Sequence, residues 1–466
     1  MNTLTRFGSA SFYRNALAIA IPVMLQVLLQ NMVSLIDNFM VAGLGDVKMS
    51  GVNIANQLLF VYFVMINVLV SAGGIFMSQF NGAKDSEGMK QTFRFKVLTT
   101  LTLAGIITVI CVALPGQMLG ILVNTNSARD AIVFEGRNYL RVIVWTFFPI
   151  AISMAIGSSL RETGNVRPPL IISVASTLVN TFFNWVFIYG NLGAPRMEVE
   201  GAALATIIAR FVELAAFIAY ARVTKPAFYI RWMELLRVNV KLFGSILRKS
   251  GILFISELSW VLTETVMTAV YNGRGGAEIV SGMAAGWAIA NLFFLVFSAI
   301  HTSIGVIVGG TLGRNELDQA KQEAKWLRSG SIVIGFAVAV CEAASVLLIP
   351  LVFGNLSPGA RLVTRHLLWV IALYLPVWTY LNAQLATGRA GGDAIMGVWV
   401  DVFVNSTMFL PGIFILAFCT GYGPIEMYAI VKLTDLVKVG IAHWQLGTGR
   451  WLKNLTTEHR TPEAAQ

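Results

Sequence analysis

The sequence is poor in charged residues and in cysteine. Only 12% of its 466 residues are Asp, Glu, Lys or Arg, about half the share found in soluble globular chains. Its three cysteines lie in apolar stretches without a CxxC pair, which argues against a disulfide framework or a zinc site. The chain also lacks P-loop, HExxH and GxSxG motifs. We therefore expect neither ATP hydrolysis nor another enzymatic activity.

Hydrophobic residues, in contrast, make up 56% of the chain, and the mean hydropathy is +0.70. About 20 apolar residues span a bilayer as a helix. Apolar runs separated by charged or Gly/Pro-rich breaks predict an all-α membrane protein with twelve transmembrane helices, at 15–43, 51–79, 95–117, 137–160, 168–190, 200–222, 249–272, 281–312, 328–353, 363–387, 394–418 and 425–447. The first run is expected to be a transmembrane helix and not a removable signal peptide.

The net charge of +10 belongs mainly to the loops. Lys and Arg gather in alternate loops and at both ends, so the positive-inside rule predicts that both termini are cytoplasmic. The positive charge then reflects orientation in the lipid bilayer, and no nucleic-acid partner is expected.

Two halves of the chain resemble each other. Gly82 in "FNGAKDSEGMKQ" matches Gly313 in "TLGRNELDQAKQ", and Arg161 in "LRETGN" matches Arg389 in "GRAGGD" at nearly the same separation. Six helices per half make this a parallel repeat around an axis normal to the membrane. The predicted organisation is an N-lobe (1–222), an amphipathic cytoplasmic linker (223–248), a C-lobe (249–447) and a cytoplasmic tail (448–466).

Asp37 is the strongest functional candidate, because charged side chains within membrane helices usually mark ion or substrate pathways. A carboxylate in this environment binds a proton or pairs with a cation. The same helix carries the polar residues Gln30 and Asn31, and Pro22, which removes a backbone hydrogen bond and predicts a kink. The alternative for Asp37 is a solvated carboxylate near the end of a helix.

Two amides lie four residues apart in the fifth predicted helix. This spacing places Asn180 and Asn184 on one face, where they can hold a carboxylate or coordinate a small cation through oxygen. The alternative is that they join helices by hydrogen bonds.

Acids recur in the second half of the chain. Glu257 and Glu264 share a face of the seventh helix, and Asp393 and Asp401 share one of the eleventh. Asp393 alternatively caps the start of a helix, where negative charge is favoured. These acids are candidates for a second cation or substrate site.

Other intramembrane charges are expected to be structural. Arg210 and Glu213 are three residues apart, as are successive members of the group Lys432, Asp435 and Lys438, so we expect each group to neutralise itself. That interpretation leaves the candidate acids, led by Asp37, without an assigned partner.

Seven segments in order resemble the bacterial branch of the multidrug and toxic compound extrusion (MATE) family. They include "DNFMVAGLG", "LRETGNVRPPLIISVASTLVNTFFNWVFIYG", "EVEGAALATIIARFVEL", "ISELSW", "NLFFLVFSAIHTSIGVIVGGTLGRNELDQA", "GRAGGDAIMGVWVDV" and "GRWLKNLT". The resemblance implies two six-helix lobes in a V in the bacterial inner membrane. It also implies efflux of cationic or amphipathic small molecules, driven by inward proton or sodium movement without a cofactor.

The resemblance further implies an N-lobe cation site at Asp37, Tyr139, Asn180, Asn184 and Thr206. It implies a C-lobe site at Glu257 and Asp393, and Asp401 resembles an acid of the bacterial branch. Some relatives carry Asp at the position of Asn184, so the coupling ion stays open between a proton and sodium, with Asp37, Asn180 and Asn184 as the sodium ligands. The chain is expected to be a monomer.

The alternative within transport is a flippase for lipid-linked precursors. Such a protein is expected to line its cavity with Arg or Lys, and the interiors of helices 1, 2, 7 and 8 carry none. This absence favours a cationic substrate.

Overall fold

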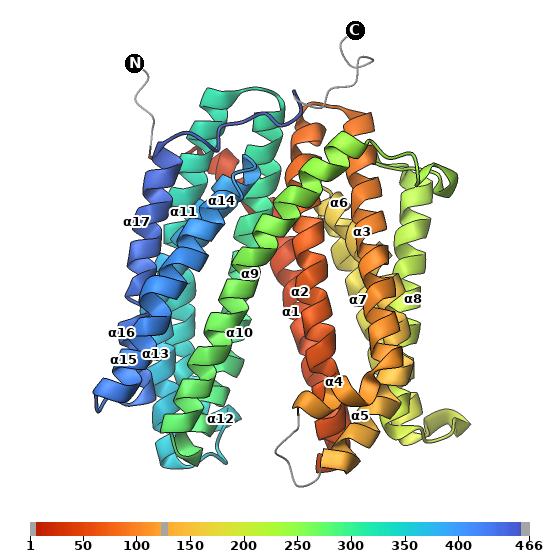
Figure 1. Ribbon diagram of the computed structural model, residues 1–466, viewed down its shortest axis with the longest axis vertical. Coiled ribbons are helices and arrows are strands. Elements are labelled where there is room, and N and C mark those ends of the chain that lie inside the picture. The colour runs from red at the N-terminus through yellow and green to blue at the C-terminus, as the bar shows by residue number, and fades with distance from the viewer. Residues whose placement is uncertain (1–5, 123–128, 458–466) are drawn as a thin grey trace. The chain divides into compact units, whose positions relative to one another are not determined.

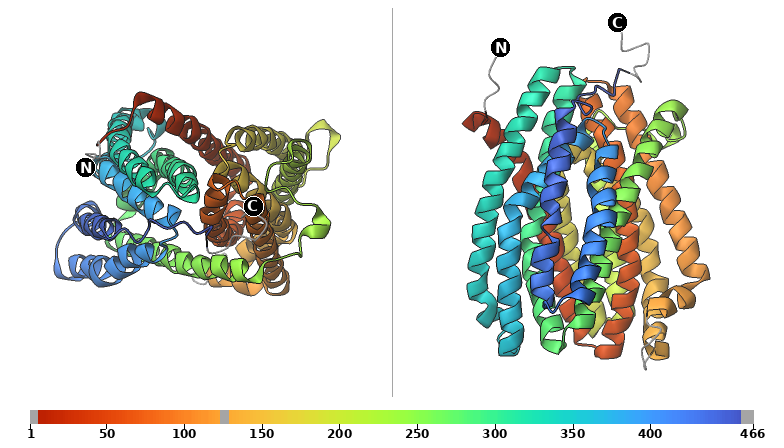
Figure 2. Two further views of the ribbon diagram at one scale, coloured as in Figure 1. Left: turned by 90° about the horizontal axis from the view of Figure 1, so that it is seen from above. Right: turned by 60° about the vertical axis from the view of Figure 1, so that its left-hand side comes forward.

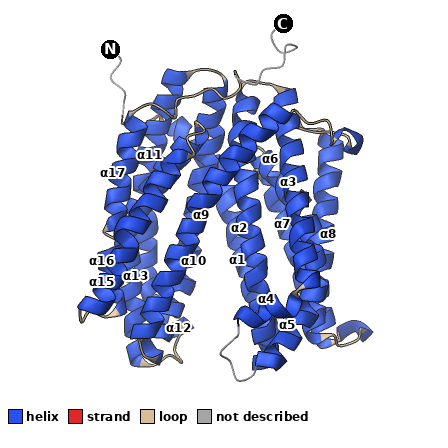
Figure 3. Cartoon of the chain, viewed as in Figure 1, coloured by secondary structure: helices blue, strands red, loops and turns tan. Residues whose placement is uncertain are grey.

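The chain is helical throughout the residues that the structure, a computed structural model, describes: 6–122 and 129–457 (Figure 1). No strand occurs within these ranges (Figure 3). Eleven helical segments in them are long and apolar enough to cross a membrane. The predicted all-α membrane fold is confirmed.

Each predicted run of the first half corresponds to a helical segment, although the segments matched to 95–117 and 137–160 begin nine and eight residues earlier than predicted. The elements of this half are α1 (Ala10–Ala42), α2 (Asp46–Gly82), α3 (Ser86–Ala113), α4 (Pro115–Leu122), α5 (Arg129–Ile143), η1 (Val144–Thr146), α6 (Phe147–Glu162), α7 (Arg167–Tyr189), η2 (Asn191–Gly193) and α8 (Glu198–Thr224). The fourth predicted helix corresponds to α5, η1 and α6 together, because the 3₁₀ turn η1 joins the two α-helices without a loop.

The second half begins with long helices and ends with irregular ones. Its elements are η3 (Trp232–Glu234), α9 (Val240–Arg274), α10 (Ala277–Gly313), α11 (Leu317–Ser345), η4 (Val346–Leu348), α12 (Ile349–Val352), α13 (Pro358–Ala390), α14 (Ile395–Gly397), η5 (Val398–Phe403), η6 (Asn405–Phe409), α15 (Leu410–Cys419), α16 (Pro424–Val431) and α17 (Thr434–Gly447). The eleventh predicted helix contains two π-helical stretches, η5 and η6, and such stretches are frequent at functional sites. The twelfth is interrupted at Lys432 and Leu433, between α16 and α17.

The residue contacts divide the chain into two compact units. We call Leu25–Met77 with Asp85–Leu247 the N-terminal unit, and the described residues of Met1–Met24, Ser78–Lys84 and Arg248–Arg460 the C-terminal unit. The division passes through α1 just after Pro22. The lobe boundaries proposed from the repeat stay a prediction.

The N-terminal unit has a continuous apolar core. Its members include Tyr62, Ile66 and Phe147, and the Tyr62 hydroxyl donates to the Phe147 carbonyl oxygen at 2.6 Å. α7 and α8 pack side by side along their length (Figure 1). The start of α3 is capped by Asp85, which accepts from the Gly88 amide at 2.9 Å and so satisfies an otherwise unpaired helix donor.

The C-terminal unit is built around α10, α11 and α13, coloured green to cyan in Figure 2. The C-terminal ends of α2 and α10, which are predicted to face the cytoplasm, approach each other closely in this unit. A Cβ on Gly313 would meet the backbone of Gln79, and one on Gly82 would meet the backbone of Gly310. The two glycines matched by the internal repeat therefore both lie where helices require the absence of a side chain.

Candidate functional site

The N-terminal unit brings Asp37 of α1 together with both amides of α7. Asn184 Nδ2 donates to Asp37 Oδ1 at 2.5 Å. With its amide turned so that the nitrogen faces Asp37, Asn180 donates to Asp37 Oδ1 at 2.9 Å and to Oδ2 at 3.3 Å. Asn180 and Asn184 are buried, whereas Asp37 is half-buried. The i, i+4 spacing that places the amides on one face therefore also directs both toward one carboxylate.

Thr206 and Tyr139 complete the surroundings of this carboxylate. In the same orientation of Asn180, its amide oxygen accepts from Thr206 Oγ1 at 3.3 Å, which links α7 to α8. Tyr139 is buried on α5, within electrostatic range of Asp37, and its hydroxyl donates to Asn56 Oδ1 at 3.3 Å. All five residues implied by the family resemblance thus lie in one region of the N-terminal unit.

The other predicted polar residues of α1 do not join this cluster. Gln30 is exposed and Asn31 is half-buried. Gln26, about three turns after the start of the apolar run at residue 15, instead contacts the neighbouring helices: its Nε2 donates to Ser173 Oγ at 2.9 Å, and its Oε1 accepts from Arg161 Nη1 at 3.4 Å. Gln26 therefore fixes α1 close to Pro22, which lies inside the helix.

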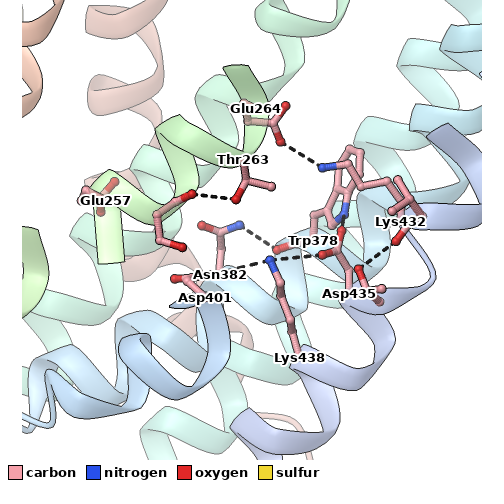
Figure 4. A network of polar contacts seen from close by, with 12 residues as sticks. Glu257, Thr263, Glu264, Trp378, Asn382, Asp401, Lys432, Asp435 and Lys438 are labelled. Atoms are coloured by element: carbon pink, nitrogen blue, oxygen red, sulfur yellow. Dashed lines mark hydrogen bonds and ion pairs between the residues drawn. The ribbon is translucent and has the colours of Figure 1, made fainter. Parts of the chain in front are cut away.

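The acids of the C-terminal unit have basic partners that lie far away in sequence. Glu257 Oε1 is 3.1 Å from Arg389 Nη2, and Glu264 Oε1 is 3.0 Å from Lys432 Nζ. Figure 4 shows the Glu264 to Lys432 contact. The expectation that these acids lack partners was wrong, because their bases come from α13 and from the break between α16 and α17.

Asp401 belongs to a second charged cluster in the same unit (Figure 4). Lys438 Nζ lies 3.7 Å from Asp401 Oδ1 and 3.5 Å from Asp435 Oδ1. Asp435 Oδ2 also accepts from Trp378 Nε1 at 2.8 Å. Lys438 therefore pairs with Asp435, as expected, and also bridges to Asp401 on another helix. The group does not neutralise itself completely, because Lys432 pairs with Glu264. Arg210 and Glu213, at 2.8 Å, do pair as expected.

Asp393 lies outside these clusters. It follows the C-terminal end of α13, and its backbone amide donates to the Gly388 carbonyl oxygen at 2.9 Å. The adjacent Gly392 carbonyl oxygen accepts from Lys249 Nζ at 2.6 Å. The structure thus places Asp393 in a helix connection, apart from Glu257 and Asp401.

Two further buried charged features escaped the sequence analysis. Lys96 of α3 is fully buried and pairs with Glu162 of α6; in the sequence it lies next to the start of the apolar run 95–117, where a charged residue is ordinary. Glu342 of α11 is also fully buried. Glu342 could have been predicted from the sequence, because it is a single acid within the apolar run "VAVCEAASVLL", just as Asp37 is a single acid within its own run.

The candidate acids predicted from the sequence have different partners in the two units. Asp37 is held by neutral amides, whereas Glu257, Glu264 and Asp401 face cations. No group of three or more His, Cys, Asp or Glu residues suited to a metal ion occurs within 6–122 and 129–457. Long apolar helices that carry buried polar clusters define a multi-pass membrane protein with functional groups inside its helix bundles.

Comparisons with known proteins agree with this class. The family model described as MatE matches residues 22–186. The chain is 24% identical to "Probable multidrug resistance protein NorM" of Thermotoga maritima, over 63% of this chain and 69% of that protein. It is 24% identical to the protein of the same name from Bradyrhizobium diazoefficiens, over 93% and 92%. The solved structure "Crystal structure of MATE in the bent conformation" matches with a TM-score of 0.82 and 18% identity, over 98% and 97%.

The match to the Bradyrhizobium protein and the structural match extend over nearly the whole chain, and the structural match confirms the predicted fold. The chain is therefore similar to MATE transporters in sequence and in fold.

Proposed function

We propose that the chain is a secondary active antiporter that exports organic cations or other amphipathic compounds by alternating access between two lobes. The exchange ion is an inward-moving proton or sodium ion. Relatives named as multidrug resistance proteins support the substrate class. Since those relatives are bacterial, the proposed location is the bacterial inner membrane, with both termini in the cytoplasm.

The observation that carries this proposal is the bonding of Asp37. Among the described residues, its hydrogen-bond partners are the amides of Asn180 and Asn184. An amide nitrogen that faces a carboxylate stabilises its charged form. If the amide turns over, its oxygen faces the carboxylate instead, and a proton or sodium ion between the two oxygens is then needed. The two amide orientations therefore suit the two states of a coupling carboxylate.

In the proposed cycle, Asp37 is charged while a cationic substrate is bound. A proton or sodium ion from outside then neutralises Asp37, and the loss of charge favours substrate release. α1 is the helix expected to rearrange, because Pro22 weakens its hydrogen bonding and Asp37 and Gln26 tie it to neighbouring helices. Glu257 and Asp401 are proposed to serve substrate or ion binding in the C-terminal unit once their basic partners move away.

The alternative function as a lipid-precursor flippase requires free positive charge for a pyrophosphate group. The bases in the C-terminal clusters are Arg389, Lys432 and Lys438, and each contacts a carboxylate. A base that already faces an acid is a weaker anion ligand than a free one. The paired bases therefore favour a cationic cargo.

The test is transport of a fluorescent organic cation by purified protein in proteoliposomes, with proton and sodium gradients imposed separately. We expect Asp37→Asn to abolish gradient-driven transport, because the amide cannot change its charge. Asp46→Asn makes the same chemical change at an exposed position in the first turn of α2 and should leave transport unchanged. Full transport by the Asp37→Asn protein would overturn the role of Asp37, and translocation of a lipid-linked pyrophosphate without any cation transport would favour the flippase.

A further inference from the structure

Glu342 is an acid that the proposed transport cycle does not use. It lies on α11, inside the candidate membrane span Leu317–Val352, and its exposed fraction is 0%. Neither of its carboxyl oxygens has a hydrogen-bond partner among the described residues. Carboxyl groups in such a position are rare, because an acid within a membrane helix is costly to keep unless it has a partner or a function.

Another buried acid of the same helix shows the usual arrangement. Glu323 is 7% exposed. Its Oε2 accepts from Thr311 Oγ1 at 2.6 Å, and its Oε1 accepts from Gln319 Nε2 at 2.8 Å. Both oxygens of Glu323 are therefore satisfied by neutral donors, whereas those of Glu342 are not.

The surroundings of Glu342 are apolar and aromatic. Its neighbours on α11, Ala339 and Ala343, pack in or against the core that contains Tyr271 and Tyr428. The two tyrosine rings meet edge to face, with centroids 6.3 Å apart, and neither hydroxyl has a hydrogen-bond partner among the described residues. Tyr428 lies within electrostatic range of Glu342. The Glu342 carboxyl group and the hydroxyls of Tyr271 and Tyr428 are thus buried in or against one core without hydrogen-bond partners among the described residues.

This environment excludes a bare carboxylate in the packed state. A charge without a hydrogen bond or a counter-ion in an apolar core is far less stable than the neutral acid. Lys432, which lies over the Tyr428 ring, pairs with Glu264 at 3.0 Å and is 5.1 to 5.6 Å from the ring centroids of Phe409, Tyr428 and Trp378. The negative charge of Glu342 therefore has to be removed in another way.

A sodium ion fits this core poorly, because hard cations require several oxygen ligands. The core offers the carboxyl group and two phenol hydroxyls, while backbone carbonyl oxygens within α11 are used by the helix itself. A proton needs only one carboxyl oxygen. We propose that Glu342 is a proton-binding site of the C-terminal unit, which holds a proton while this core is packed and releases it when the core opens.

On release, the O–H bond of the Glu342 carboxylic acid breaks, the proton passes to a water molecule, and a hydrated carboxylate remains. Protonation in the packed state does not depend on the proposed antiport. Release during transport does, since it needs the alternating access proposed above.

The first test is infrared spectroscopy of the purified full-length protein at neutral pH. The wild type should show the carbonyl absorption of a protonated carboxylic acid, and this band should shift in D₂O. Glu342→Gln should lose the band, whereas Glu323→Gln is the matched control and should keep it. Absence of the band from the wild type, or its full retention in the Glu342→Gln protein, would overturn the proposal. If Glu342→Gln does not fold, Glu342→Asp serves instead and should change the band's frequency; an unchanged band would count against the assignment.

The second test measures protons moved per substrate molecule in proteoliposomes. Glu342→Gln should lower this ratio, and Glu323→Gln should not. An unchanged ratio in the Glu342→Gln protein would refute release during transport. If Asp37→Asn stops transport while Glu342→Gln leaves the ratio intact, the antiport proposal stands and only the coupling role of Glu342 fails. If the wild type moves no cation, the antiport proposal fails, and the infrared test still decides whether Glu342 carries a proton.

Discussion

Removal of the buried cation Lys96 should strongly destabilise the N-terminal unit. Lys96 lies on α3 with 0% side-chain exposure, and its Nζ contacts the Glu162 carboxylate on α6. It also donates to Ser158 Oγ at 3.1 Å and to Ser159 Oγ at 3.4 Å. Lys96→Met keeps most of the aliphatic side chain, which packs against Gly73, and removes only the charge and the hydrogen bonds.

The magnitude follows from the burial of the remaining carboxylate. Loss of one partner from a buried ion pair costs about 3–5 kcal/mol, because the other charge stays behind. The Glu162 side chain is 16% exposed, and Arg161 lies within electrostatic range of it. Both features make the unpaired Glu162 carboxylate less costly, so we expect Lys96→Met to reduce the free energy of unfolding by about 3 kcal/mol, at the lower end of that range.

A double-mutant cycle in detergent micelles measures this coupling, with unfolding followed by circular dichroism. Glu162→Gln alone should destabilise the protein, and the double variant Lys96→Met/Glu162→Gln should recover about 2 kcal/mol relative to the sum of the single losses. Lys90→Met is the matched control, because Lys90 lies on the same helix with a 34% exposed side chain, 3.9 Å from Glu87; it should cost less than about 1 kcal/mol. If the losses of the two single variants add up to the loss of the double variant within about 0.5 kcal/mol, Lys96 and Glu162 are not coupled and the prediction fails.

Two further predictions concern the C-terminal unit. Gly313→Ala should lower the thermal unfolding midpoint and reduce the free energy of unfolding by about 1–3 kcal/mol, because the added Cβ overpacks against α2. Gly305→Ala on the same helix is the control and should not lower the midpoint, because its added Cβ meets nothing within 4 Å. Equal midpoints for the two variants would contradict the close approach at Gly313. Lys438→Met leaves Asp401 and Asp435 facing each other without their shared cation and should cost about 3–5 kcal/mol, part of which Asp401→Asn should restore. A Lys438→Met protein as stable as the wild type would show that the bridge contributes little.

The fold was largely predictable because hydropathy reports membrane helices directly. The runs at 168–190 and 200–222 correspond closely to α7 and α8. The partner of Lys432 was not predictable, since it is Glu264, which lies 168 residues away in sequence. Hydropathy detects how apolar a segment is, but it carries no information about which distant side chain a lysine will meet.

The candidate site was predictable to the extent that helical spacing defines it. Asn180 and Asn184 share a face because they are four residues apart, and the structure brings both to Asp37. Tyr139 and Thr206 came only from the family resemblance, because a single hydroxyl on an apolar helix is not distinctive. Their functional roles stay predictions.

The partners of the second-half acids could not be predicted from spacing. Glu257 and Arg389 are separated by 132 residues, and only the tertiary fold brings their side chains together. Helical spacing predicts ion pairs within one helix, such as Lys438 with Asp435, whereas Glu257, Glu264 and Asp401 pair with bases on other elements.

The contrast between the two units bears on which acid exchanges ions. Glu257 and Glu264 each face a base, so each must break an ion pair before it accepts another cation, and that step opposes exchange. Asp37 is bonded to neutral amides that can donate or accept, so it can take up a proton or sodium ion by local reorientation. Between Asp37 and these paired acids, we therefore propose that Asp37 exchanges the ion, and we expect the paired acids of the C-terminal unit to respond only when their helices separate.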